Sequence, residues 1–89
     1  MTALECFANN VKALRLEKGW GQLELAQAAG LSTLTICRLE RKLHAPSIET
    51  ARMIAIALDG DLHSMCTEMY AIPEVSWHGI GKRREDYGQ

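Results

Sequence analysis

The chain has 89 residues and a formal net charge of −1, from ten Lys and Arg against eleven Asp and Glu. This length gives one domain that buries only about 60–65% of its unfolded surface, and the near-zero charge argues against a general coat for nucleic acid. No stretch approaches the roughly 20 apolar residues that span a membrane, and the N-terminus lacks the pattern of a signal peptide. We therefore expect a cytoplasmic protein.

The first two predicted elements are helices separated by a glycine-containing turn. Residues 4–18 carry apolar side chains at helical spacing. Thr2 and Glu5 in front of them fit a capping box, in which each side chain satisfies an amide of the first turn. A second, shorter helix is predicted over residues 22–30, where a glycine ends it.

Three further helices and a tail complete the chain. The third helix is predicted over residues 32–41, with a serine as its N-cap. A Pro-Ser pair opens the fourth, which ends at an Asp-Gly pair, so it covers residues 46–60. The fifth runs from residue 61 or 62 to about Tyr70, before Pro73 makes continuation unfavourable. Because no segment indicates a strand, the fold class is all-α.

The cysteines and histidines indicate no metal site, cofactor or disulfide framework. They stand at wide spacings: Cys6, Cys37, Cys66, His44, His63 and His78. We expect three reduced thiols, because an odd number of cysteines without a CxxC pair does not suit a disulfide scaffold, and the histidines lack ligand spacing. No paired carboxylates, Ser/His/Asp set or phosphate-binding loop is present. We therefore predict no enzyme.

The break at Gly30 indicates two helices that cross at a steep angle. Such a crossing brings the backbones close, so the first helix needs a small residue, which Ala26 supplies, while Gly30 can take a positive φ at no steric cost. The stretch LRLEKGWGQLELAQAAGLSTLTICRLERKLHAPSIETARMIAIAL resembles the XRE family of helix-turn-helix proteins, the group that includes lambda repressor and Cro. This resemblance implies a five-helix, lambda-repressor-like helix-turn-helix domain at residues 1–72 and a tail at 73–89.

The resemblance makes the third predicted helix the recognition helix, which reads bases in the major groove. Ile36 and Leu39 are expected to face the core. Four residues on the other side are the predicted base-reading set: Thr33, Leu34, Cys37 and Arg38. Arginine can bond guanine bidentately, and Thr or Leu methyl groups can meet a thymine methyl. Two alternatives stay open, since Arg38 could be a solvated charge and Leu34 could pack against a partner.

A second set of residues is predicted to bind phosphates, which positions a protein without reading sequence. These residues are Gln22, Ser32, Arg41, Lys42 and His44. Gln22 matches the family position at which a side chain joins the free amides of a helix start. The resemblance also implies a structural pair of Arg15 and Glu40. Lys42 stands where family members often have Gly, so it either adopts a left-handed backbone at about 1 kcal/mol or the loop follows another path.

The last part of the chain is predicted to supply an interface. Helix-turn-helix proteins usually bind as dimers on half-sites one turn, about 34 Å, apart. The apolar residues in excess of a five-helix core are Met65, Met69, Ile72 and Trp77. Alternatively, Trp77 folds back over the fourth and fifth helices. The basic run at residues 82–84 could contact DNA, although the acidic residues beside it favour a solvated tail.

Two functions are consistent with these sequence features. The first is a sequence-specific transcriptional regulator, a repressor that binds double-stranded DNA at a palindromic operator as a homodimer. The alternative is an antitoxin or anti-activator that keeps the same fold and uses its C-terminal tail to bind a partner protein.

Overall fold

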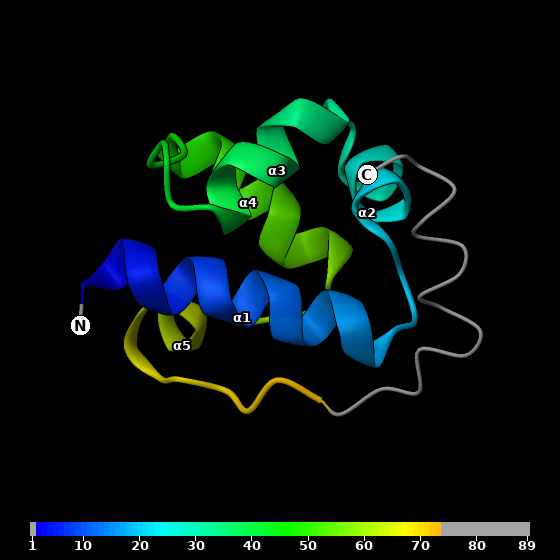
Figure 1. The fold of residues 1–89 in the computed structure, drawn as a ribbon. Helices are drawn as coiled ribbons and strands as arrows, with labels where there is room; N and C mark the ends of the chain where they lie inside the picture. Colours follow the sequence, from blue (N-terminus) through cyan, green and yellow to red (C-terminus); the bar gives the residue numbers. More distant parts are fainter. Residues whose placement is uncertain (1, 74–89) are drawn as a thin grey trace.

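The computed structural model describes residues 2–73, and this part of the chain forms five helices and no strand. The helices are α1 (Ala3–Glu17), α2 (Gln22–Ala29), α3 (Thr33–Glu40), α4 (Ile48–Ala57) and α5 (Leu62–Thr67). α1 packs against α5 on one side and against α3 on the other, while α2 contacts both α3 and α4 (Figure 1). The predicted all-α fold is confirmed. Among the described helices, none combines the length and apolar character that crossing a membrane requires.

The helix starts follow the local chemistry of the sequence. In the predicted capping box of α1, the Thr2 amide donates to Glu5 Oε1 at 2.8 Å and the Glu5 amide donates to Thr2 Oγ1 at 3.1 Å. The backbone hydrogen bond from Thr2 lowers the pKa of the Glu5 carboxyl. Side chains of Ser32, Ser47 and Asp61 cap α3, α4 and α5 in the same way, each accepting from an amide of the first turn.

The core is built from apolar side chains of all five helices. Its largest fully buried members are Val11, Leu25, Ile36, Ile54 and Met65. Met65 has 0% of its surface exposed, so the prediction that it offers interface surface is wrong. The reason is the packing of α5 against α1 and α4, which places this side chain in the core cluster.

A buried polar cluster fastens the segment after α5 to α1. Asn10 is 0% exposed, and its Nδ2 donates to the carbonyls of Met65 and Glu68 while its Oδ1 accepts from the Tyr70 amide at 2.8 Å. The neighbouring Asn9 donates to the Tyr70 carbonyl at 3.0 Å. One side chain thus satisfies three backbone groups that no helix or strand pairs, as a buried polar cluster requires.

This cluster corrects the predicted end of the fifth helix. The sequence pattern predicts a helix to about Tyr70, but α5 ends at Thr67 and Glu68 is extended, with φ −113° and ψ 151°. Because Asn10 supplies the hydrogen bonds that further helical turns would otherwise supply, the chain leaves the helix and runs along α1 (Figure 1). Met69 and Ile72 lie on this extended segment and are exposed.

All three cysteines are free thiols, Cys6 buried and the other two half-buried. Burial, with a smaller contribution from nearby Cys6, raises the pKa of the Cys66 thiol. This thiol is therefore held in its unreactive protonated form at neutral pH.

Candidate nucleic-acid interface

The turn between α2 and α3 has the backbone that its sequence predicts. Gly30 lies in the left-handed region, with φ 74° and ψ 32°. The Leu31 amide donates to the Ala26 carbonyl at 2.8 Å, and the Gly30 amide donates to the Gln27 carbonyl at 3.3 Å, so two carbonyls of the last turn of α2 are satisfied. Ala26 is 1% exposed and leaves room for α3 to cross. The chain therefore turns sharply from α2 into α3.

α3 divides into a buried side and an outer side. Ile36 and Leu39 belong to the core. The outer side exposes Thr33, Leu34 and Arg38, and Leu34 has 55% of its surface accessible to solvent. Cys37 beside them is half-buried. The structure thus brings the four predicted base-reading residues onto one short helix. Three of them are exposed enough to contact a ligand, whereas only part of the Cys37 side chain is accessible.

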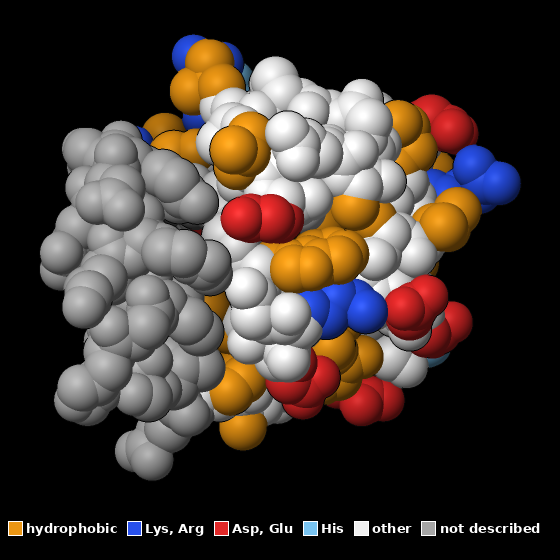
Figure 2. Space-filling view, turned by 90° about the vertical axis from the view of Figure 1, so that its right-hand side faces the viewer, with side chains coloured by type: hydrophobic (Ala, Val, Ile, Leu, Met, Phe, Trp, Pro, Cys, Tyr) orange, Lys and Arg blue, Asp and Glu red, His pale blue; other side chains and the backbone are white. Residues whose placement is uncertain are grey.

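The charge of this region is positive although the whole chain is slightly acidic. Residues 32–47 contain one acidic residue, Glu40. Arg38, Arg41 and Lys42 are exposed, as is His44, whereas Glu40 is buried against Arg15. On the face seen from the side of α2, by contrast, acidic, basic and apolar side chains are interspersed (Figure 2). α3 and the loop that follows it therefore carry a local excess of exposed positive charge, which suits an approach to phosphates.

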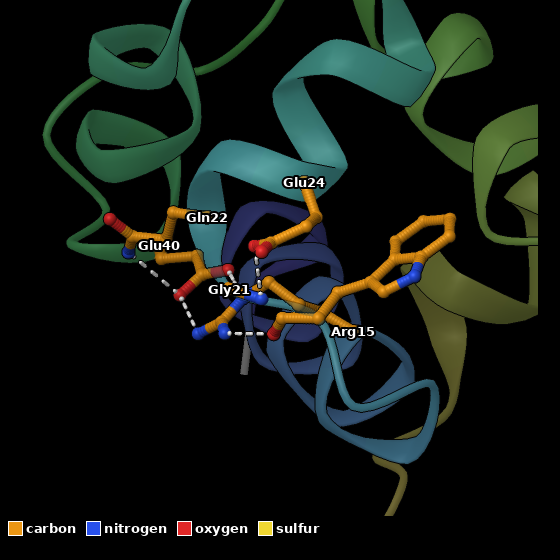
Figure 3. Close-up of polar contacts among 6 residues, drawn as sticks. Arg15, Gly21, Gln22, Glu24 and Glu40 are labelled. Atoms are coloured by element: carbon orange, nitrogen blue, oxygen red, sulfur yellow. Dashed lines mark hydrogen bonds and ion pairs between the residues drawn. The ribbon is translucent and has the colours of Figure 1, made fainter. Parts of the chain in front are cut away.

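A buried ion pair joins α1 to the end of α3 (Figure 3). Arg15 Nε lies 2.7 Å from Glu40 Oε2, and Nη2 donates to Oε1 at 2.9 Å. The remaining guanidinium nitrogen, Nη1, donates to the Trp20 carbonyl at 2.9 Å. The two side chains are only 5% and 6% exposed, so the pair that the family resemblance implies is present. It links the end of α3 to α1.

Gln22, the first residue of α2, reaches the same ion pair. Its Nε2 donates to Glu40 Oε1 at 3.2 Å (Figure 3). The N-cap of α2 is Gly21, which has no side chain to cap the helix, although its own amide donates to Glu24 Oε1 at 2.7 Å. The first amides of α2 thus have no side-chain acceptor within residues 2–73. The sequence predicted Gln22 at a helix start but did not reveal its contact with Glu40.

Ser32 has the predicted capping role. Its Oγ accepts from the Thr35 amide at 3.1 Å and shares a second hydrogen bond with Thr35 Oγ1 at 2.9 Å. When Thr35 is the donor of that second bond, the Ser32 hydroxyl proton is free to point outward. The additional phosphate contact predicted for Ser32 therefore stays compatible with its capping bond.

Lys42 adopts the strained conformation that was one of its two predicted alternatives. Its φ is 62°, and its amide donates to the Leu39 carbonyl at 2.9 Å while the Leu43 amide donates to the Arg38 carbonyl at 2.9 Å. These two bonds form the motif that usually places Gly at this position. The loop after α3 thus follows the path of a glycine-containing loop with a lysine in its place.

Lys42→Gly is expected to raise the free energy of unfolding by about 1 kcal/mol, because the left-handed backbone then no longer crowds a Cβ. For a domain of this size the Tm rises by about 4–8 °C. Thermal unfolding followed by circular dichroism measures this shift. The control is Lys42→Ala, which also removes the charge but keeps the Cβ, so it should give no such gain. Equal stability of the two variants would contradict strain at this residue.

Of the three remaining predicted interface residues, two lie within the described part of the chain. Met69 and Ile72 lie on the surface beside α1, 47% and 42% exposed. Trp77 and the basic run at residues 82–84 lie outside the described residues.

Comparisons with known proteins agree with this geometry. The sequence pattern of a helix-turn-helix family matches residues 11–63, more than half of the chain. A similar solved structure is that of a mutant of the restriction-modification controller protein C.Esp1396I, with 27% identity and a TM-score of 0.65 over 71% of this chain and 82% of that chain. No curated protein sequence matches the chain. The chain belongs to the XRE-type helix-turn-helix family, and it is a DNA-binding transcription regulator rather than an enzyme.

Proposed function

We propose that the protein is a repressor that binds a palindromic operator as a homodimer, each protomer placing α3 in the major groove of one half-site. The observation that carries this proposal is the division of α3, whose inner side is held in the core while Thr33, Leu34 and Arg38 extend outward beside exposed positive charge. Occupancy of an operator is sufficient for repression, whereas activation requires a further contact surface. The similarity to a restriction-modification controller protein supports a role in controlling genes.

Base reading is assigned to Thr33, Leu34 and Arg38, with Cys37 at the edge of the set. Arg38 stands near the middle of the outer side, where its guanidinium can bond the two major-groove acceptors of a guanine. The Thr and Leu methyl groups on the preceding turn suit a thymine methyl. Phosphate contacts from Gln22, Ser32, Arg41, Lys42 and His44 would fix the orientation of α3 in the groove.

Arg38→Ala is expected to weaken operator binding by about 1–3 kcal/mol and to relax specificity at one base pair. Competition titrations against a set of operators with single base changes measure both effects. The matched control is Arg41→Ala at the end of the same helix, which should weaken every duplex alike and lower the salt slope by about one. A uniform loss for Arg38→Ala as well would show that Arg38 contacts phosphate instead.

The dimer surface is assigned to Met69 and Ile72. A single helix-turn-helix reads only a few base pairs, and a second protomer doubles the site. The Asn10 cluster holds the extended segment that carries both side chains against α1, so the surface is presented in a fixed shape. We include Trp77 in this proposed surface because the sequence has it among the apolar residues that exceed the needs of a five-helix core.

Ile72→Asp is expected to shift the protein from dimer to monomer, because it places a charge in an apolar contact. Sedimentation measured over a range of protein concentrations shows the change in mass. Ile48→Asp is the control, since Ile48 is 81% exposed on α4, away from the α5 end. An unchanged dimer in Ile72→Asp would remove this surface from the homodimer and leave it to the alternative partner, a second protein.

The proposed function is tested by titrating the protein with the DNA directly upstream of its own gene, at two salt concentrations, with random duplex as competitor. A repressor of its own promoter should bind tightly, resist the competitor and lose affinity steeply with salt. Footprinting then gives the operator and shows whether it is palindromic. Binding no tighter than to random DNA would contradict an operator at this site.

A further inference from the structure

The contact with Glu40 permits only one of the two orientations of the Gln22 side-chain amide. Gln22 Nε2 lies 3.2 Å from Glu40 Oε1. A carboxylate accepts hydrogen bonds and cannot donate them, so the NH₂ group of the amide faces Glu40 and the carbonyl oxygen points away (Figure 3). The reversed amide would set two oxygen atoms against each other. Glu40 therefore fixes the orientation of this amide, and with it the direction of the second N–H of the NH₂ group.

Glu40 is itself held at both of its carboxylate oxygens. Arg15 binds both carboxylate oxygens, at 2.7 and 2.9 Å, and the same guanidinium is fixed to the Trp20 carbonyl at 2.9 Å. Both side chains of the ion pair are almost fully buried. The acceptor that meets Gln22 is thus part of a rigid cluster. Gln22, which is half-buried, is bound to this cluster through the end of its side chain.

The contact with Glu40 leaves donor capacity for a ligand. The NH₂ group of glutamine has two N–H donors, and a single acceptor occupies one of them here. The second has no acceptor within residues 2–73, and the residue keeps part of its surface open to solvent. A free glutamine side chain loses much rotamer freedom when it is ordered, whereas this one is already ordered in the protein without DNA.

We infer that Glu40 and Arg15 are positioning residues for a phosphate contact made by Gln22: the ion pair fixes the amide so that its second N–H meets a backbone phosphate at the start of α2. This inference rests on the proposed DNA-bound function. It links the ion pair to affinity, in addition to its part in holding α1 and α3 together. Because Gln22 is neutral, its contact releases no counterion and should leave the salt slope of binding unchanged.

A double-mutant cycle on operator binding tests this coupling. Gln22→Ala alone should weaken binding about tenfold, as the loss of a hydrogen bond to a charged group, on every duplex and without change of the salt slope. Glu40→Gln keeps an oxygen that Arg15 can bind but no longer dictates the orientation of the amide. In the Glu40→Gln background, Gln22→Ala should cost about threefold or less. A loss of about tenfold in both backgrounds would overturn the inference.

Arg41→Ala is the matched control for the cycle. Arg41 lies next to Glu40 in sequence, is exposed and takes no part in the ion pair. Its effect should therefore be the same in the wild-type and Glu40→Gln backgrounds. Circular dichroism confirms that each variant is folded at the temperature of the titration. If Arg41→Ala also changed its effect, Glu40→Gln would be acting through general disorder of α3, and the inference would fail.

A measurement on the unmodified protein removes the dependence on Glu40→Gln being folded. Gln27 lies on the same helix, is exposed and forms no side-chain hydrogen bond within residues 2–73. In the free protein, the ¹⁵N{¹H} NOE of the Gln22 side-chain amide should approach that of the backbone, while that of Gln27 should be low. Equal side-chain mobility of the two would overturn the inference. The proposed function has its own test: it is contradicted if the wild-type protein prefers no operator over random DNA, whatever the mobility of Gln22.

Discussion

Glu40→Ala is expected to lower the free energy of unfolding by about 3–5 kcal/mol, which is the typical result of removing one partner from a buried ion pair. The Arg15 guanidinium would lose both of its bonds to Glu40 while remaining buried, and its charge would then have no counterpart. Since a small domain has only about 5–15 kcal/mol of stability, a large share would disappear. Urea unfolding monitored by circular dichroism measures the loss.

The control for this prediction is an ion pair of the same kind at the surface. Arg52 lies 3.3 Å from Glu49 on α4, and both side chains are mostly exposed, so Glu49→Ala should cost less than about 0.5 kcal/mol. Replacing both buried partners, Arg15→Met with Glu40→Leu, should restore most of the lost stability because no unpaired charge remains. Similar losses for Glu40→Ala and Glu49→Ala would show that the buried pair contributes little.

Asn10→Ala is expected to lower the free energy of unfolding by about 3 kcal/mol, because it leaves the carbonyls of Met65 and Glu68 and the amide of Tyr70 without their partner in a buried or partly buried environment. The same variant should release the segment after α5, so exchange of the Tyr70 amide proton should accelerate more than the global loss of stability explains. Urea unfolding and hydrogen exchange followed by NMR provide the two measurements.

Asn9→Ala is the matched control for the buried amide. Asn9 donates to the Tyr70 carbonyl and to Asn10 Oδ1 but is only half-buried, so its removal should cost about 1 kcal/mol. If Asn9→Ala and Asn10→Ala were equally destabilising, the assignment of three backbone partners to Asn10 would be wrong. If Asn10→Ala also weakened dimerisation, this would link the cluster to the proposed surface at Met69 and Ile72.

The features that sequence predicted correctly are those set by local chemistry. The capping box of Thr2 and Glu5 and the serine cap of α3 depend on residues three apart, and the left-handed turn at Gly30 depends on one residue. The family resemblance added the pair of Arg15 and Glu40, which the sequence spacing alone would not have revealed. The roles of individual side chains on DNA remain predictions.

The features that sequence missed depend on contacts between distant parts of the chain. The apolar spacing from Leu62 to Met69 fits a longer helix, and only Asn10, about 60 residues away in sequence, explains why α5 stops early. A signal was nevertheless present. Asn10 lies on the apolar stripe of α1, between Phe7 and Leu14 in helical spacing, and a polar residue at such a position needs a buried partner. For Lys42, sequence left two alternatives open, and the backbone hydrogen bonds of the loop select the left-handed one.

The separation of the two sides of α3 has a consequence for evolution and engineering. Thr33, Leu34 and Arg38 form no side-chain hydrogen bond or ion pair within residues 2–73, whereas the opposite side of the helix and its end at Glu40 hold it in place. Substitutions on the outer side are therefore nearly neutral for folding. A lineage of such proteins can therefore change its target sequence by single substitutions while each intermediate variant stays folded. In engineering, a library randomised at these three positions should yield mostly folded members with new target preferences.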